Sequence, residues 1–345
     1  MTSEPEQFLA VSTAATAPAR SRSGAAKRSR HGSRKTARSK DVKIELHAVI
    51  VSVLSGEPVF CVETDAQSGL PRLPVAQFRP DRHRSLEQPL IDVYLEDFEG
   101  RTSNPELLDC RLSDETSGAH AKCIEITYLI LVRPMPVKRG AASGETDAAG
   151  GGKLRWQSVY MTLPWEDWRH GRPSLLDAVV LPLFAPSGDG TSRSGGVRKR
   201  GRTRRDFKLS ADAALFADTD TDWDPRRTRD RYEALAARGA IAELVEGGQA
   251  DSRLGTVMVA GERRRLSLAL GHLRRAIKDR PDVGGVMPSE FTLFELQKCV
   301  EAILGPALHK QNFRRQLDAS RLLEPVGRVK GDTGGRPAQL YRFAR

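Results

Sequence analysis

The stretch from Phe291 to Arg345 reads FTLFELQKCVEAILGPALHKQNFRRQLDASRLLEPVGRVKGDTGGRPAQLYRFAR. Thr292 and Glu295 have the spacing of a capping box, in which a hydroxyl and a carboxylate each bind a free backbone N–H at a helix start. An apolar stripe follows at helical spacing, and it stops at Gly305-Pro306. Because Gly tolerates a left-handed cap and Pro cannot continue a helix, the sequence predicts that a first helix ends there.

A second helix is predicted from about Leu308 to Ser320. Only Phe313 and Leu317, one turn apart, need to face a core. Its remaining side chains are polar, and Arg and Lys suit guanine edges or phosphates while Asn and Gln suit adenine edges. We therefore predict a recognition helix, although a solvated surface helix has the same pattern. Its candidate DNA-binding residues are His309, Lys310, Gln311, Asn312, Arg314 and Arg315.

A basic hairpin is predicted directly after this helix. Val326–Lys330 and Gln339–Phe343 have the pattern of two strands, and GDTGG supplies a turn between them. Arg336 stands between Gly335 and Pro337, and such a narrow, extended tripeptide can carry a guanidinium into a minor groove. Residues 289–345 therefore predict a winged helix-turn-helix, for which the partner is duplex DNA.

The composition favours a polyanionic partner. The chain has 345 residues, a formal net charge of +11 and a pI of about 9.7, which also fits a membrane surface. The sequence has no apolar run long enough for a transmembrane helix, and its first residues carry acids where a signal peptide would be basic. The four cysteines are scattered, which predicts neither a zinc site nor a disulfide framework. We expect a cytoplasmic setting.

The chain before the winged helix divides by composition. Residues 1–41 predict a disordered basic tail that either adds weak DNA affinity or only solubilises. Residues 42–185 alternate strand patterns with one helix over Leu86–Glu99, whose Leu86, Leu90, Val93 and Leu95 should share a face. Residues 186–222 predict a flexible Gly/Ser/Arg-rich linker.

A helical connector is predicted over residues 223–288. Leu266, Leu270, Leu273 and Ile277 share one face of it, and that stripe should pack on the winged helix or on a second subunit. The basic side chains are expected elsewhere on the helix. They are Arg263, Arg264, Arg274, Arg275 and Lys278.

HKQNFRRQL followed by GGRPAQLYRF resembles the Nudix-related transcriptional regulators, the NrtR-type family, and the wider stretch most resembles its NAD-biosynthesis repressor (NadQ-like) branch. The resemblance covers residues 42–345 apart from two flexible insertions, and it is specific in the winged helix and loose before it. It implies an α+β fold with an N-terminal degenerate Nudix-like α/β/α domain plus a C-terminal winged helix-turn-helix. It also implies a homodimer, a palindromic operator and a nucleotide effector.

The Nudix box decides whether the first domain can be an enzyme. The motif is Gly-x5-Glu-x7-Arg-Glu-apolar-x-Glu-Glu-x-Gly, and placing its last Gly on Gly100 puts Ser85, Tyr94 and Phe98 at glutamate positions. One carboxylate, Asp97, remains, and it cannot hold a hydrated divalent cation alone. We predict no catalytic residue, no metal and no cofactor. The alternatives are an active Nudix hydrolase of nucleoside diphosphate derivatives with a DNA-binding appendage, and an RNA-binding protein.

The loop FRPDRHRS precedes the box helix. Its Arg79, Arg82, His83 and Arg84 stand where an active enzyme of the family would hold substrate phosphates, and they could bind a diphosphate or adenylate without a metal. A solvent-facing basic loop explains them equally well. The resemblance thus implies a repressor of NAD biosynthesis genes that senses an NAD-related nucleotide of the NAD, ADP-ribose or ATP class.

Overall fold

The computed structural model describes residues 42–98, 101–113, 122–133, 154–185, 211–216, 223–245, 251–330 and 338–344. The predicted basic tail, Gly100, Arg336 and the turn GDTGG lie outside the described residues, as does the side chain of Asp97. The domain boundaries given above stay predictions.

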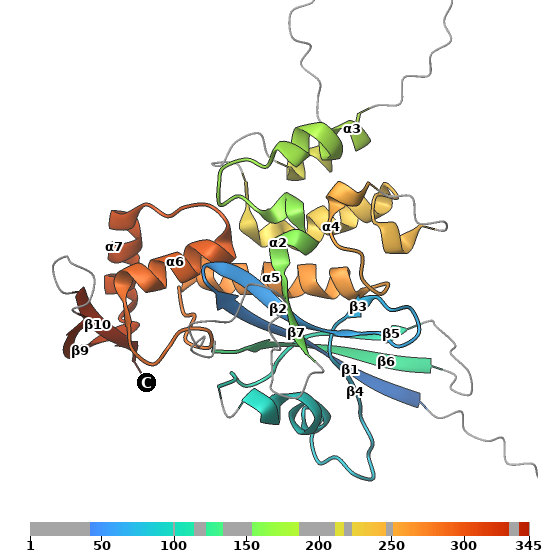
Figure 1. Cartoon of the computed structure of the whole chain (residues 1–345), viewed down its shortest axis with the longest axis horizontal. Coiled ribbons are helices and arrows are strands. Elements are labelled where there is room, and N and C mark those ends of the chain that lie inside the picture. The colour runs from blue at the N-terminus through green and yellow to red at the C-terminus, as the bar shows by residue number, and fades with distance from the viewer. Residues whose placement is uncertain are drawn as a thin grey trace, which may run out of the picture. The chain divides into compact units, whose positions relative to one another are not determined.

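A mixed seven-stranded sheet is built from residues 42–158 (Figure 1). Its strands are β1 (Val42–Leu54), β2 (Glu57–Thr64), β3 (Pro71–Arg72), β4 (Val75–Gln77), β5 (Glu106–Ser113), β6 (Lys122–Leu131) and β7 (Arg155–Ser158). The order is β3-β2-β1-β6-β5, with β4 on β1 and β7 on β2. The central strands β1 and β6 run parallel, so they are buried on both faces and read as continuous apolar runs.

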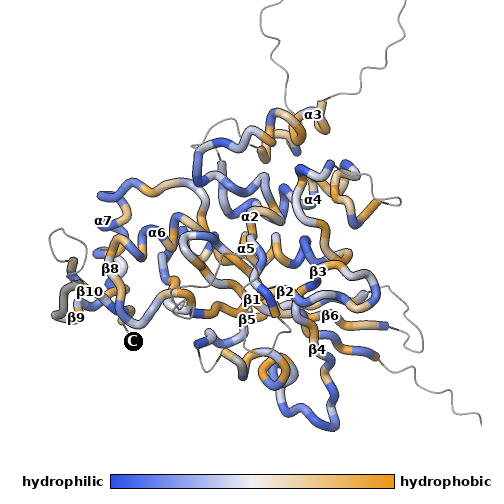
Figure 2. The backbone as a smooth tube through the Cα atoms, in the orientation of Figure 1, coloured by the Kyte–Doolittle hydropathy of each residue, from blue (hydrophilic) through white to orange (hydrophobic). Residues whose placement is uncertain are grey.

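Both faces of this sheet are covered, because side chains alternate across a strand. Leu46, Ala48 and Ile50 pack with the helical segment 88–98 on one face. Val49 and Val51 pack with the helices that follow residue 158 on the other. Figure 2 shows the hydrophobic residues of these strands in orange along the middle of the sheet. The predicted α/β/α layering and the mixed helix and sheet fold class are confirmed.

The helical segment below the sheet in Figure 1 consists of α1 (Gln88–Leu90), η1 (Ile91–Leu95) and η2 (Glu96–Phe98). Its buried side chains are Pro89, Leu90, Tyr94, Leu95 and Phe98, whereas Leu86 and Val93 are exposed. The predicted shared face was therefore wrong for Leu86 and Val93. Leu86 precedes the helix, which begins at Gln88, and the π-helical turn at Ile91–Leu95 changes the angular spacing that the sequence pattern assumed for Val93.

The upper face is covered by short helices and one long one. They are α2 (Val159–Thr162), η3 (Pro164–Glu166), η4 (Leu176–Val180), α3 (Leu181–Leu183), η5 (Ala213–Leu215), η6 (Pro225–Arg227), α4 (Thr228–Ala237), η7 (Ala242–Leu244), η8 (Ser252–Leu254) and α5 (Glu262–Asp279). Within the stretch predicted as a linker, Ala213, Leu215 and Phe216 are buried in this layer.

Helix α5 carries the apolar stripe that the sequence predicted. Leu266, Leu270, Leu273 and Ile277 are all buried, in one cluster with side chains of the sheet and of the C-terminal helices. The stripe therefore packs within the chain. Two of the basic side chains predicted to lie away from this stripe, Arg263 and Arg274, are fully buried in ion pairs.

The C-terminal region forms the predicted winged helix. It contains β8 (Phe291–Thr292), α6 (Leu293–Leu304), α7 (Lys310–Ser320), β9 (Leu323–Lys330) and β10 (Ala338–Phe343), with the small sheet in the order β8-β10-β9. The capping box is present: Thr292 Oγ1 accepts from Glu295 N–H, and Thr292 N–H donates to Glu295 at 2.8 Å. No helix among the described residues is long and apolar enough to cross a membrane.

Candidate nucleic-acid interface and effector cavity

Helix α7 separates an apolar anchor from a polar outer surface. Phe313 and Leu317 are 3% and 4% exposed, so they fix the rotation of the helix on the core. The six residues predicted to contact DNA within this helix and its N-cap are all exposed, namely His309, Lys310, Gln311, Asn312, Arg314 and Arg315. We call them the α7 face. Arg315 donates to Asn312 Oδ1, and this bond holds the Arg315 guanidinium beside the Asn312 amide group. Both groups can donate to the edges of bases in a DNA groove.

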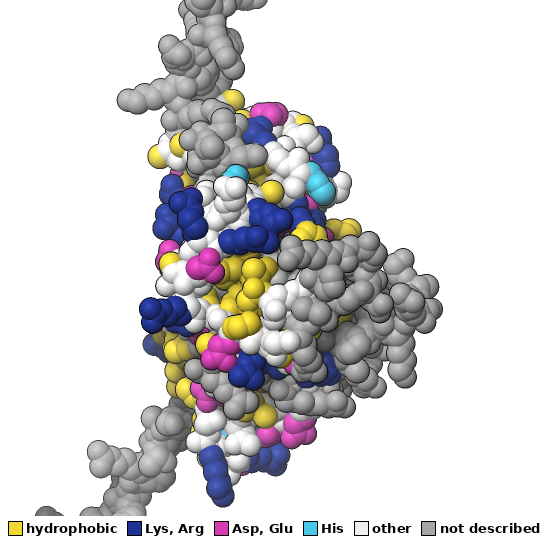
Figure 3. Space-filling model, turned by 90° about the vertical axis from the view of Figure 1, so that its left-hand side faces the viewer, with side chains coloured by type: hydrophobic (Ala, Val, Ile, Leu, Met, Phe, Trp, Pro, Cys, Tyr) yellow, Lys and Arg dark blue, Asp and Glu magenta, His cyan; other side chains and the backbone are white. Residues whose placement is uncertain are grey.

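The start of helix α6 extends this surface. Leu293, Phe294, Gln297 and Lys298 meet Lys310, Phe313 and Arg314 around a groove of about 190 Å³. Phe294 is 68% exposed, and the Lys298 ammonium lies 5.8 Å from its ring centre. Figure 3 faces the side where α6 and α7 lie in Figure 1, and it shows Lys and Arg side chains around an exposed hydrophobic area. The sequence analysis did not predict Phe294 and Lys298 as part of this surface, because the spacing of apolar residues along the helix does not indicate that they are exposed.

The turn between α6 and α7 is fixed by a carboxylate. Glu301 accepts from Gln297 at 2.9 Å and from the backbone N–H of Leu308 at 3.0 Å, and its other oxygen accepts from Lys298 at 2.8 Å. Burial alone would raise the pKa of Glu301, but these donors hold it below its ordinary value. An ionised side chain of α6 thus binds the backbone of the turn that leads to α7.

A buried ion cluster joins the winged helix to the rest of the chain. Glu166 is fully buried, and it accepts from Arg231 at 2.6 and 2.9 Å and from Arg274. Arg274 also donates to the carbonyl of Ile303, at the end of α6, at 2.8 Å. Both guanidinium groups lie on the Trp223 ring, about 5 Å from its centre. We call Glu166, Arg231 and Arg274 the hub.

Two further contacts support the same connection. The Tyr160 hydroxyl donates to the carbonyl of Ala302 in α6 at 2.6 Å. Gln316 of α7 donates to the carbonyl of Lys278, at the end of α5, at 2.9 Å. Gly305, which ends α6, has φ of 105° and an added Cβ would lie 3.4 Å from Trp223, so only glycine suits this position. The winged helix is therefore held by buried polar contacts as well as by apolar packing.

The basic loop before helix α1 partly surrounds a cavity. Arg79, Arg82 and His83 line a space of about 320 Å³, together with residues of β4 and of the helical segment that include Pro89 and Asp92. His83 Nδ1 accepts from Arg79 N–H at 2.9 Å, which leaves its Nε2 to act as the donor. Arg84 is exposed and is not among the residues that line this space. The structure thus brings together three of the four predicted ligand residues.

Tyr94 and Phe98, which the sequence analysis placed at glutamate positions of a Nudix box, are core side chains. The Tyr94 hydroxyl donates to Glu63 at 3.1 Å and to the carbonyl of Val75 at 2.9 Å, and Phe98 is 1% exposed. Ser85 is exposed. Neither an aromatic ring nor a phenol committed to these acceptors offers the carboxylate oxygens that Mg²⁺ requires.

A different group of possible metal ligands lies on the α5 side of the sheet. Glu45, His47 and Glu125 place one ligand atom each within 4.8 Å of one another. However, Arg265 donates to Glu125 at 2.6 Å and already supplies a positive charge there. Burial, and then Arg265, also lower the pKa of His47 well below its ordinary value, so the imidazole is neutral.

Comparison with known proteins identifies the C-terminal region. Residues 283–343 match the NrtR DNA-binding winged helix domain. The ADPR responsive transcriptional repressor NtrR of Acinetobacter baylyi is 51% identical over 59 residues, which are 17% of this chain and 23% of that protein. The match thus spans about a quarter of the relative's length. The resemblance to the NrtR-type regulators is confirmed for the winged helix.

Solved structures give wider but weaker similarities. Shewanella oneidensis NrtR has a TM-score of 0.49 at 14% identity, over 88% of this chain and 94% of that one. The same protein complexed with a 27mer DNA has a TM-score of 0.48 at 14% identity, over 87% and 93%. A MutT/nudix family protein from Enterococcus faecalis has a TM-score of 0.47 at 12% identity, over 89% and 90%.

Proposed function

We propose that this chain is a transcriptional repressor that binds duplex operator DNA through the α7 face. The observation that carries the proposal is the six-residue polar surface over the Phe313 and Leu317 anchor, in a region that matches a DNA-binding domain. A helix of this kind fits the major groove, where its N-terminal residues reach base edges.

The proposed contacts follow from side-chain chemistry. Arg314 and Arg315 suit the acceptor edge of guanine or a phosphate, and Gln311 and Asn312 suit adenine. Lys310 and His309, at the helix start, suit the phosphate backbone. Arg336, between Gly335 and Pro337, is proposed to enter the adjacent minor groove. In a homodimer, two such faces would read a palindromic operator, and we propose that arrangement.

For the effector we propose an NAD-related nucleotide, bound at the cavity beside the basic loop. Arg79, Arg82 and His83 offer charge-assisted donors to a diphosphate, and Arg84 stands at the rim of the same loop. Because the Acinetobacter relative is named as responsive to ADPR, ADP-ribose is the first compound to test. The regulated genes would then be those of NAD biosynthesis.

We further propose that the chain does not hydrolyse nucleotides. The support is that Tyr94 and Phe98, which the predicted register places at glutamate positions of the box, lie in the core. Purified protein with Mg²⁺ or Mn²⁺ and a panel of nucleoside diphosphate derivatives should show no turnover. Steady turnover of ADP-ribose or NADH that Asp97→Ala abolishes would establish the hydrolase instead.

Regulation by the effector requires that it bind the free and the DNA-bound conformations with different affinity. The hub and the Tyr160 and Gln316 contacts offer a physical route between the sheet domain and α7, since they join α4 and α5 to α6 and α7. A ligand that shifts α5 would change the position of α7 through these bonds.

The test is a titration of the protein on duplex DNA from upstream of its own gene and of neighbouring NAD-synthesis genes. It is run with and without NAD, ADP-ribose, ATP and nicotinate nucleotides, and against a scrambled duplex and a single-stranded RNA of equal length. We expect preference for one upstream duplex and a shift of its Kd with one nucleotide. Equal affinity for the scrambled duplex and the RNA would contradict the proposal.

A further inference from the structure

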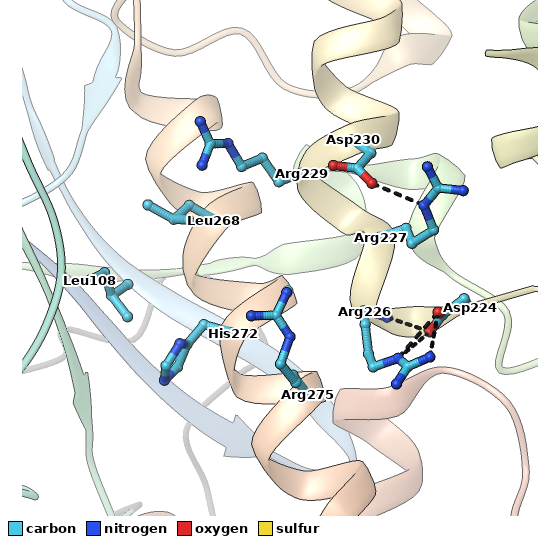
Figure 4. Close-up of a pocket in the computed structure, with 10 residues that line it drawn as sticks. Leu108, Asp224, Arg226, Arg227, Arg229, Asp230, Leu268, His272 and Arg275 are labelled. Atoms are coloured by element: carbon cyan, nitrogen blue, oxygen red, sulfur yellow. Dashed lines mark hydrogen bonds and ion pairs between the residues drawn. The ribbon is translucent and has the colours of Figure 1, made fainter. Parts of the chain in front are cut away.

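A second groove, distinct from the cavity at the basic loop, crosses helix α5. It has a volume of about 470 Å³, and Figure 4 shows the residues that line it. They come from β5, from η6 and the first turn of α4, and from α5, namely Leu108, Asp224, Arg226, Arg227, Arg229, Asp230, Leu268, Gly271, His272 and Arg275. We call it the α5 groove. At Gly271 an added Cβ would lie 3.4 Å from the carbonyl of Arg226, so η6 crosses α5 closely there.

The lining of this groove is positively charged. Four arginines face two aspartates, which leaves a formal excess of two positive charges before the histidine is counted. Arg226 forms a two-bond pair with Asp224, and Arg227 donates to Asp230 at 2.9 Å. Burial acts to raise the pKa of Asp224, but the bonds from Arg226 lower it to about 2. This carboxylate therefore stays ionised and holds Arg226 in place.

Two arginines of the groove have donors to spare. Arg275 is exposed and has no hydrogen bond or ion pair with any residue that the structure describes. Arg229 lies 3.7 Å from Glu233, too far for a good hydrogen bond, and its side chain extends toward Leu268 (Figure 4). Arg presents planar, paired donors that match a phosphoryl group. The groove thus offers donors whose acceptor the protein does not supply.

The other wall of the groove is apolar. Leu108 of β5 and Leu268 of α5 are half-buried and face the space beside His272, whose Nε2 lies 2.8 Å from Glu106. An inorganic anion would leave these leucines uncovered. A ring attached to a phosphate would cover them, and burial of apolar area would add to its affinity. The lining therefore selects an organic phosphate over a free anion.

We propose that the α5 groove binds a small organic phosphate, with its phosphoryl group on Arg275 and Arg229 and its ring against Leu108 and Leu268. The groove also adjoins the winged helix. Lys278, one turn beyond Arg275, lies 3.9 Å from Asp224, and its carbonyl accepts the bond from Gln316 of α7. Arg274, next to Arg275, belongs to the hub. A ligand in the α5 groove would contact the end of α5 that binds α7, which makes this a second regulatory site.

The test uses the full chain carrying Arg82→Ala/Arg84→Ala, so that the basic loop contributes least to ligand binding. No DNA is present, so the result does not depend on the proposed function. Calorimetry measures the binding of ADP and of inorganic pyrophosphate. We expect ADP to bind more tightly than pyrophosphate, and Arg275→Ala and Arg229→Ala each to weaken ADP by roughly tenfold or more. Arg280→Ala removes an exposed arginine of the same segment outside the groove and should change nothing.

Three results would overturn the proposal. The first is that ADP does not bind this protein, and the second is that it binds equally well after Arg275→Ala and Arg229→Ala. The third is that Arg275→Ala leaves ADP binding intact but lowers the affinity for the operator duplex and flattens its salt dependence, which would make the groove a DNA contact. Thermal melting of each variant, expected to match the parent because both arginines lie at the surface, separates these results from unfolding.

Discussion

The hub and the α7 face are both rich in arginine, yet their arginines are in opposite states. In the hub, Arg231 and Arg274 are 1% and 0% exposed, and their donors are used by Glu166, by backbone carbonyls and by the Trp223 ring. On the α7 face, Arg314 and Arg315 are exposed, and Arg315 bonds a neighbour on its own helix.

The difference shows that the role of an arginine depends on whether the fold supplies acceptors for its guanidinium group. A buried guanidinium must be paired, because the desolvation cost of an isolated charge is prohibitive. An exposed one keeps its donors for an external acceptor. The hub therefore carries stability and the position of α6, whereas the α7 face carries binding with little effect on stability.

The largest predicted effect is at the centre of the hub. Glu166→Gln leaves two buried guanidinium groups without a counter-ion, so the free energy of unfolding should fall by about 3–5 kcal/mol. Urea unfolding followed by circular dichroism measures it. Glu233→Gln is the matched control, since Glu233 pairs with Arg264 at 2.8 Å but is 44% exposed, and we expect its removal to cost less than ~1 kcal/mol. Equal effects of the two changes would remove the contrast between buried and exposed pairs.

A second buried carboxylate predicts a pH dependence. Burial, opposed by Arg265, raises the pKa of Glu262 to about 7. The unfolded chain releases this proton near pH 4.5 and the folded chain near pH 7, so stability falls as pH rises through that window and is level above it. The fall is roughly 3 kcal/mol.

Glu262→Gln should remove the part of the pH dependence that Glu262 causes. Contributions of opposite sign remain, such as that of His47, whose lowered pKa reduces stability in acid. Unfolding free energies of parent and variant are compared between about pH 5 and pH 8, where most folded proteins are stable. If the difference between them is the same at both ends, Glu262 is ionised in the fold and the prediction is wrong.

A smaller effect is expected where the sheet domain meets α6. Tyr160→Phe removes the donor to the Ala302 carbonyl and leaves that acceptor buried, at a cost of about 1 kcal/mol. Amide hydrogen exchange should accelerate in α6 more than in β1. Tyr128→Phe, whose hydroxyl bonds Glu87 on the opposite face of the sheet, should not accelerate exchange in α6. Uniform acceleration in both variants would argue against a specific link.

The sequence could predict the winged helix because its signals are local. The Thr292 capping box, the stop at Gly305 and the Phe313 and Leu317 anchor each lie within a few residues, and the structure confirms all of them. The exposure of the α7 face followed directly from that anchor. The DNA contacts themselves stay a proposal.

The hub could not be predicted, because its partners are far apart in the chain. Arg231 and Arg274 are 65 and 108 residues from Glu166, and in the sequence they look like ordinary surface charges of amphipathic helices. The π-helical turn at Ile91–Leu95 was missed because such turns are rare and the sequence pattern was read at α-helical spacing. Arg79, Arg82 and His83 of the basic loop line a cavity and Arg84 stays outside its lining, and their role as phosphate ligands stays a prediction.

The most direct test of the α7 face is the affinity of Arg314→Ala/Arg315→Ala for the operator duplex as a function of salt. We expect binding to weaken by about 1–3 kcal/mol for each base that the variant no longer reads, or the salt dependence to flatten, at an unchanged melting temperature. Lys122→Ala/Arg253→Ala removes the same charge from exposed positions outside the winged helix and should bind as the parent does. Unchanged operator affinity in the α7 variant would contradict the account.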